Sequence, residues 1–100
     1  MSVYLMLTSL TDAGRKAIQE DPESLRDINK EVELMGVKIL DQYALLGQYD
    51  FVNILEAPSN EAITKLAIRL SAGGSYQTLT LAAISMDDLI ETLKQKESPW

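Results

Sequence analysis

The sequence has 100 residues, of which 46% are hydrophobic and 24% are charged, a composition typical of one folded domain and outside the disordered range. Fifteen acidic and nine basic residues give a net charge of −6, and the scattered cations form no basic stripe, so binding to nucleic acid is not expected. The sequence contains neither cysteine nor histidine, which excludes disulfides, thiol nucleophiles, Cys/His zinc sites and histidine-based proton relays.

The N-terminal residues, 1–8, carry no cationic lead. Their apolar run is too short for a signal peptide or a membrane span. The missing cysteines favour the cytosol for a domain of this size. We therefore expect a cytoplasmic protein without a membrane partner.

Residues 3–8 form an almost continuous apolar run, which predicts a central strand that is buried on both faces. Thr11 is the predicted N-cap of a short helix that follows this strand. Asp21 is expected to cap a second helix, which Gly36 ends. The apolar positions of the second helix recur at helical spacing: Leu25, Ile28, Val32 and Met35.

Two strands are predicted at mid-chain, over residues 37–46 and 51–56. Residues 47–50 join them as a hairpin turn, in which Gly47 supplies a positive φ. This turn is expected to fix the register of the two strands, because a one-residue slip would invert every buried side chain.

A helix capped by Ser59 or Asn60 is predicted after the third strand, and the glycines at 73 and 74 stop it. Residues 76–84 form the fourth predicted strand, with a clean alternation of polar and apolar side chains. Ser85 then caps a last helix, which is built on Leu89, Ile90 and Leu93.

This order of elements predicts an α+β protein with the ferredoxin-like βαββαβ fold and a C-terminal helix, as a single domain over residues 1–100. Its four-stranded antiparallel sheet would carry the helices on one face. The other face is also apolar, because large apolar residues occupy both parities of the first three strands. Since monomers rarely expose such a surface, we expect a homodimer through the sheet face, or a higher oligomer.

Several short motifs give the sequence a resemblance to the GYD-domain family. Its signature, Gly-x-Tyr-Asp, is matched by Gly47, Gln48, Tyr49 and Asp50. The motif Glu56-Ala57-Pro58 follows at the family's offset, and Thr11-Asp12-Ala13-Gly14, Asp21-Pro22 and Gly36-Val37-Lys38 fit its layout over residues 3–88. The resemblance implies a dimeric α/β barrel, usually bacterial, and does not imply a particular reaction.

Four polar side chains are candidates for ligand binding: Tyr4, Tyr49, Asp50 and Asn53. Tyr49 and Asp50 either form a functional pair at the hairpin, or shape the turn through packing and backbone hydrogen bonds. Asn53 is either a structural amide or a ligand contact, and Tyr4 is either a core residue or a pocket residue with a polar handle. No residue is assigned as catalytic. No metal site is expected, because capping explains the acidic residues at the helix starts.

Two functions remain open at this point. The first is a non-catalytic assembly module or a module that binds a small apolar molecule. The second is a cofactor-free oxygenase or isomerase-like enzyme, as dimeric α/β barrels can host, with a tyrosine or aspartate that transfers a proton in a pocket between helices and sheet. Neither requires a cofactor.

Overall fold

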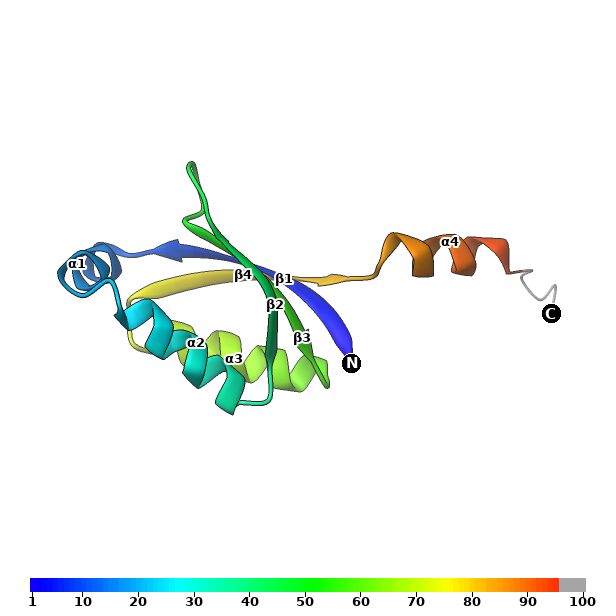
Figure 1. The fold of residues 1–100 in the computed structure, drawn as a ribbon, viewed down its shortest axis with the longest axis horizontal. Helices are drawn as coiled ribbons and strands as arrows, with labels where there is room; N and C mark the ends of the chain where they lie inside the picture. Colours follow the sequence, from blue (N-terminus) through cyan, green and yellow to red (C-terminus); the bar gives the residue numbers. More distant parts are fainter. Residues whose placement is uncertain (96–100) are drawn as a thin grey trace.

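The computed structural model describes residues 1–95 (Figure 1). Residues 96–100 of the expected domain lie outside the described residues. The elements are, in chain order, β1 (Ser2–Leu10), α1 (Asp12–Glu20), α2 (Ser24–Leu34), β2 (Lys38–Ala44), β3 (Phe51–Ala57), α3 (Asn60–Ala72), β4 (Tyr76–Ala83) and α4 (Met86–Lys94).

The four strands form one antiparallel sheet in the order β2-β3-β1-β4. This is the strand order of the ferredoxin-like fold, so the predicted α+β class is confirmed. The first crossover holds two helices, α1 and α2. Helices α2 and α3 lie on the same side of the sheet, and α4 extends away from it beyond the end of β4 (Figure 1).

Hydroxyl side chains cap three of the helices as predicted. Thr11 accepts a hydrogen bond from the N–H of Gly14, Ser59 from that of Ala62, and Ser85 from that of Asp88. The predicted cap at Asp21 is wrong: α2 begins at Ser24, and its N-cap residue makes no side-chain capping bond. The backbone carbonyl of Asp21 instead accepts from the N–H of Ser24 in a tight turn, which delays the helix.

The core lies between the sheet and the two covering helices. Met6, Leu55 and Leu66 are almost completely buried there, with Val32 of α2 and Ile63 of α3 packed against the same cluster. Burial of a large apolar side chain stabilises the fold by about 1.5–3 kcal/mol. This layer therefore holds α2 and α3 to the sheet.

The second strand is shorter than predicted. It ends at Ala44 rather than at residue 46, and its pairing with β3 is irregular between Ile39 and Asp41. The bulge inserts Leu40 and changes which side chains share a face. Ile39 pairs with Leu55 and joins the core side, while Tyr43 pairs with Val52 on the other side.

The sheet face away from the helices is apolar, as predicted from the two-sided strands. The pairing of β1 with β3 and β4 brings seven of its side chains together. We call this surface the open sheet face: Val3, Leu5, Leu7, Val52, Ile54, Leu79 and Leu81.

Strand β4 has an unexpected orientation. Its threonines, Thr78 and Thr80, pair with Thr8 and Met6 on the helix side. Its leucines, Leu79 and Leu81, therefore point to the open sheet face. A register shift of one residue would reverse this arrangement, so the sequence of β4 places its larger apolar side chains away from the protomer's own core.

Candidate binding sites

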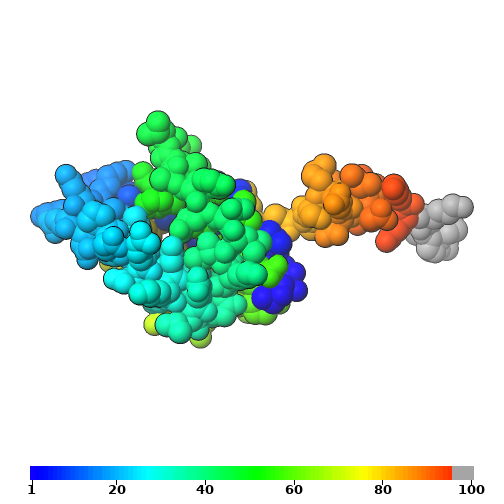
Figure 2. Space-filling model, in the orientation of Figure 1, coloured from blue at the N-terminus to red at the C-terminus, as the bar shows by residue number. Residues whose placement is uncertain are grey.

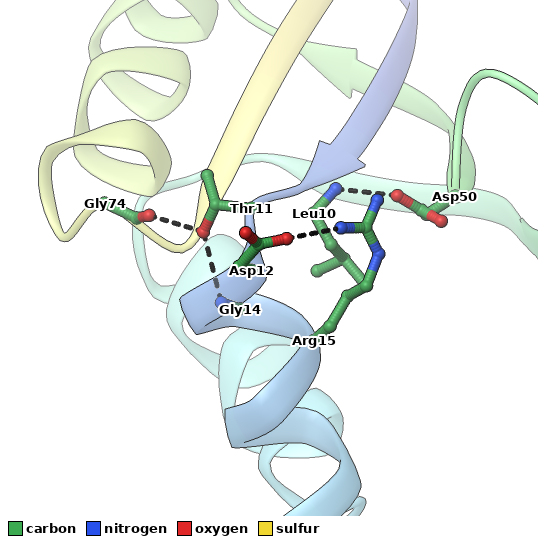
Figure 3. Close-up of polar contacts among 7 residues, drawn as sticks. All are labelled: Leu10, Thr11, Asp12, Gly14, Arg15, Asp50 and Gly74. Atoms are coloured by element: carbon green, nitrogen blue, oxygen red, sulfur yellow. Dashed lines mark hydrogen bonds and ion pairs between the residues drawn. The ribbon is translucent and has the colours of Figure 1, made fainter.

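Asp50 ties the hairpin turn to the end of β1. Its carboxylate accepts a hydrogen bond from the N–H of Leu10 at 2.7 Å (Figure 3). Its own N–H donates to the carbonyl of Thr8 at 2.8 Å, and its carbonyl accepts from the N–H of Leu45 at 2.8 Å. These contacts connect two segments far apart in the sequence, which is a structural use of the carboxylate.

The Thr-Asp-Ala-Gly motif at residues 11–14 contacts the turn at residues 74–75, which precedes β4, at the same end of the sheet. The hydroxyl of Thr11 accepts from the N–H of Gly14 at 3.1 Å and donates to the carbonyl of Gly74 at 2.6 Å (Figure 3). The N–H of Thr11 donates to the carbonyl of Ser75 at 3.0 Å. The nearby ion pair of Arg15 and Asp12 is exposed and contributes little to stability.

Gly14 allows this close approach. A Cβ at its position would lie 2.1 Å from the carbonyl oxygen of Ser75, which is shorter than any non-bonded contact between such atoms. The motif residues 11–14, the turn at 74–75 and the carboxylate of Asp50 thus form one anchored junction. They join β1, the hairpin and β4.

The remaining part of the Gly-x-Tyr-Asp tetrad shapes the hairpin. Gly47 has a φ of 119°, in the region that favours glycine, so the prediction of a positive φ is confirmed. Tyr49 is half-buried beside it. The hairpin of β2 and β3 rises beyond the sheet on the side opposite the helices (Figure 1).

Tyr4 lies far from this junction. It is buried, and its hydroxyl donates a short hydrogen bond to the side-chain oxygen of Asn60 at the start of α3. Leu10, the partner of Asp50, lies six positions after Tyr4 in β1, which corresponds to roughly 20 Å along a strand. The structure therefore does not gather Tyr4, Asp50 and Asn53 into one site.

Asn53 lines an apolar cavity of about 240 Å³ between the sheet and the helices. Met6, Phe51 and Leu55 line its sheet side. Its lining also comes from α2, β2, α3 and β4: Leu25, Ile28, Asn29, Val32, Ile39, Gln42, Tyr43, Ala44, Leu66, Leu70 and Tyr76, with Thr8 of β1.

Three amides connect the elements around this cavity. The side chains of Asn29 and Gln42 exchange two hydrogen bonds of 2.9 Å, from α2 to β2. Gln42 also donates to the side-chain oxygen of Asn53 at 2.6 Å. Asn53 therefore has a protein partner, which agrees with the structural alternative, although it also lines the cavity. Asn29 and Gln42 were not predicted, since only the folded register brings them together.

Tyr76 also lines the cavity, although the sequence favours a core or interface role for this strand tyrosine over pocket lining. Partial burial raises the pKa of its phenol above the ordinary value of 10.0, because the charged form is poorly solvated there. At neutral pH this phenol is a hydrogen-bond donor and not a base. The cavity thus offers an apolar volume, amides that bond to each other and a protonated phenol, a combination suited to binding.

The described part of the chain offers neither a metal centre nor a membrane-spanning helix. Among residues 1–95 no group of three or more acidic side chains is arranged to hold a metal ion. Over the same range, no helix is both long and apolar enough to cross a membrane.

The strand order, the helix layer and the cavity define a small ferredoxin-like α+β protein with a cavity between its two layers. The sequence model of the GYD domain matches residues 4–93, so the chain belongs to the GYD-domain family. The resemblance inferred from residues 47–50 is confirmed.

A relative from Thermus thermophilus is 40% identical over 95 residues, which cover 94% of this chain and 100% of the relative. That protein is named glutamine synthetase and cystathionine beta-lyase binding protein. No solved structure gives a significant match.

Proposed function

We propose that the chain is a non-catalytic binding protein that acts as a cytoplasmic homodimer and takes another protein as its partner. The observation that carries this proposal is the orientation of β4. Leu79 and Leu81 point to the open sheet face, where they are 44% and 45% exposed in the protomer. A face of this kind is stabilised by a second protein surface.

The total surface of the protomer supports the same proposal. The chain exposes 7372 Å², whereas a folded monomer of 11.1 kDa exposes about 5,700 Å². The excess is on the order of 1,500 Å², to which the projecting α4 contributes (Figure 1), and a standard interface buries about 800 Å² of each partner. A second copy meets this requirement with a two-fold, self-complementary contact.

The protein partner is inferred from the relative. Its name assigns binding to two enzymes, and full-length similarity at 40% identity makes the same class of partner the first to test. A homodimer presents each exposed surface twice, which strengthens binding to an oligomeric enzyme through multivalency.

The dimer is tested by native mass spectrometry and by light scattering. The wild-type chain is expected at twice its mass of 11.1 kDa, and Leu81→Lys is expected at the protomer mass because it places a charge in the contact. Leu34→Lys is the matched control, since Leu34 is 88% exposed on α2. A wild-type chain that stays at the protomer mass at micromolar concentration contradicts the dimer.

The protein partner is tested by surface plasmon resonance with the immobilised wild-type chain. Glutamine synthetase and cystathionine beta-lyase of the organism that encodes the chain are the analytes, and serum albumin is the control. Retention of at least one of the two enzymes is expected. If neither enzyme is retained more strongly than albumin, the class of partner inferred from the relative is wrong, whatever the result for the dimer.

A second candidate function is the binding of a small apolar molecule in the cavity. It is favoured by the volume of about 240 Å³, which suits a one- or two-ring compound. Indole is a suitable probe in a titration followed by NMR. Ala44→Phe at the exposed rim is expected to weaken binding, whereas Ala72→Phe on α3, outside the lining, is expected to leave it unchanged. Equal affinities for the two variants contradict a site in this cavity.

The enzyme alternative has less support from the same cavity. Tyr76 is a titratable residue of its lining on the helix side of the sheet, whereas Tyr43, also in the lining, pairs with Val52 on the other side. The raised pKa of Tyr76 works against proton abstraction near neutral pH. Asp50, the carboxylate considered for that role, is bonded to the N–H of Leu10 at the end of β1. Binding without catalysis therefore fits these side chains better.

A further inference from the structure

Helix α4 projects from the body of the protein. It follows β4 after two residues, Ile84 and Ser85, and stands clear of the sheet and of the other helices (Figures 1 and 2). In the space-filling view it forms an arm beside the compact part of the chain (Figure 2).

The arm is amphipathic. Its apolar side chains occupy positions i, i+3, i+4 and i+7, which form one stripe along a helix. We call this the α4 stripe: Met86, Leu89, Ile90 and Leu93. Met86 is 69% exposed, Ile90 45% and Leu93 74%, so the body of the protomer does not cover it.

A helix of this length needs a partner. It has nine residues, and isolated helices shorter than about 12–15 residues are marginal in water. The cap at Ser85 and the exposed ion pair of Lys94 with Glu91 contribute too little free energy to hold the helix folded by themselves. Packing of the α4 stripe against another surface therefore has to supply the rest of the stabilisation.

We propose that the α4 stripe packs on a second copy of this chain, so that the two protomers exchange their C-terminal arms. This inference rests on the proposed homodimer and assigns a role to the arm within it. The open sheet face and the arm adjoin along the chain, because Ala83 pairs with Val3 at the end of β4 and is followed directly by Ile84, which is 65% exposed. One partner surface therefore covers both regions.

The exposed area also favours a second copy. The excess on the order of 1,500 Å² per protomer is larger than the roughly 800 Å² that each partner buries in a standard interface. The projecting arm contributes to this excess (Figure 2), so a contact that also covers the arm buries part of it. In a two-fold dimer each arm finds the same receiving surface on the other protomer, so neither stripe stays exposed.

The contact is tested by paramagnetic relaxation in mixed dimers. Because the chain has no cysteine, Glu91→Cys on the polar side of α4 provides a single attachment point for a nitroxide. The tagged chain is mixed with an untagged, ¹⁵N-labelled wild-type chain, in which only contacts between protomers broaden signals. Broadening is expected at the open sheet face of the untagged chain. Broadening confined to samples with tag and label on the same chain means that the arm folds back, and overturns the inference.

A substitution pair gives an independent measurement. Leu93→Lys is expected to raise the dissociation constant of the dimer about tenfold, which corresponds to about 1.4 kcal/mol, while Thr92→Lys, beside the stripe, leaves it unchanged. Circular dichroism checks that both variants fold. Equal constants for the two variants overturn the arm exchange.

The two proposals fail in different ways. A wild-type chain at the protomer mass removes the homodimer and the arm exchange together. A stable dimer with equal constants for both variants and no broadening between protomers removes the arm exchange alone. If Leu93→Lys keeps the dimer but loses a partner enzyme, the stripe serves a foreign protein, which also contradicts the exchange.

Discussion

The contact between Gly14 and Ser75 provides a test of the junction at the end of the sheet. In Gly14→Ala the new Cβ would lie 2.1 Å from the carbonyl oxygen of Ser75 and 3.0 Å from its carbonyl carbon. These are backbone atoms, and the oxygen also accepts the hydrogen bond from Thr11. The turn must therefore move by about 1 Å before alanine fits, because protein interiors are closely packed.

The expected cost follows from three contributions. Overpacking costs about 1–3 kcal/mol, and weakening the bond from Thr11 to Ser75 costs about 1 kcal/mol. Alanine regains about 1 kcal/mol over glycine within a helix. The free energy of unfolding should fall by about 1–3 kcal/mol, which lowers Tm by about 10 °C for a domain of this size.

Gly73→Ala is the matched control. Gly73 has a φ of −79°, and a Cβ there meets no atom within 4 Å, so its stability should be unchanged or higher by about 0.5 kcal/mol. Both variants are followed by thermal and urea unfolding at one protein concentration, because assembly makes stability depend on concentration. If Gly14→Ala is as stable as Gly73→Ala, the account of the junction is wrong.

Three further substitutions test individual groups. Asp50→Ala removes the acceptor for the N–H of Leu10 and should lower the free energy of unfolding by about 1–3 kcal/mol in urea, whereas unchanged stability with altered ligand binding would assign Asp50 to a binding site. Tyr76→Phe should lose less stability above pH 10 than the wild type. Burial raises the pKa of the Tyr76 phenol in the folded protein. Below the ordinary pKa the phenol is protonated in both the folded and the unfolded protein, and as the pH rises it ionises first in the unfolded protein, which destabilises the wild-type fold. Parallel losses in urea titrations at alkaline pH contradict this. Thr80→Val replaces a buried hydroxyl that has no hydrogen-bond partner among the described residues and should raise stability by about 1 kcal/mol; a lower Tm argues for a hidden partner of that hydroxyl.

The fold was predictable because local signals agreed with each other. Apolar periodicity identified the strands and helices, and hydroxyl residues marked the starts of α1, α3 and α4. The start of α2 was not predicted, because the turn formed by the backbone of Asp21 competes with the cap that its side chain would offer. Such a choice depends on backbone geometry more than on residue type.

The cavity was less predictable. Asn53 was recognised because it interrupts an apolar strand, but its partners Gln42 and Asn29 come from two other elements. The pairing of Gln42 with Asn53 depends on the bulge near Leu40, which the sequence pattern did not reveal. The sequence does contain one amide side chain on each of three neighbouring elements, Asn29, Gln42 and Asn53. That these amides lie close together can be predicted only when the strand register is known.

The bulge in β2 also affects how the sheet edges behave. Strand β2 is one edge of the sheet, and its broken pairing together with the charges of Lys38 and Asp41 discourages addition of a foreign strand. The opposite edge, β4, has no charged residue over Tyr76–Ala83 and shows no such interruption in its pairing. Aggregation of unassembled protomers is therefore expected to begin by strand addition at β4, because this edge has neither a bulge nor charged residues.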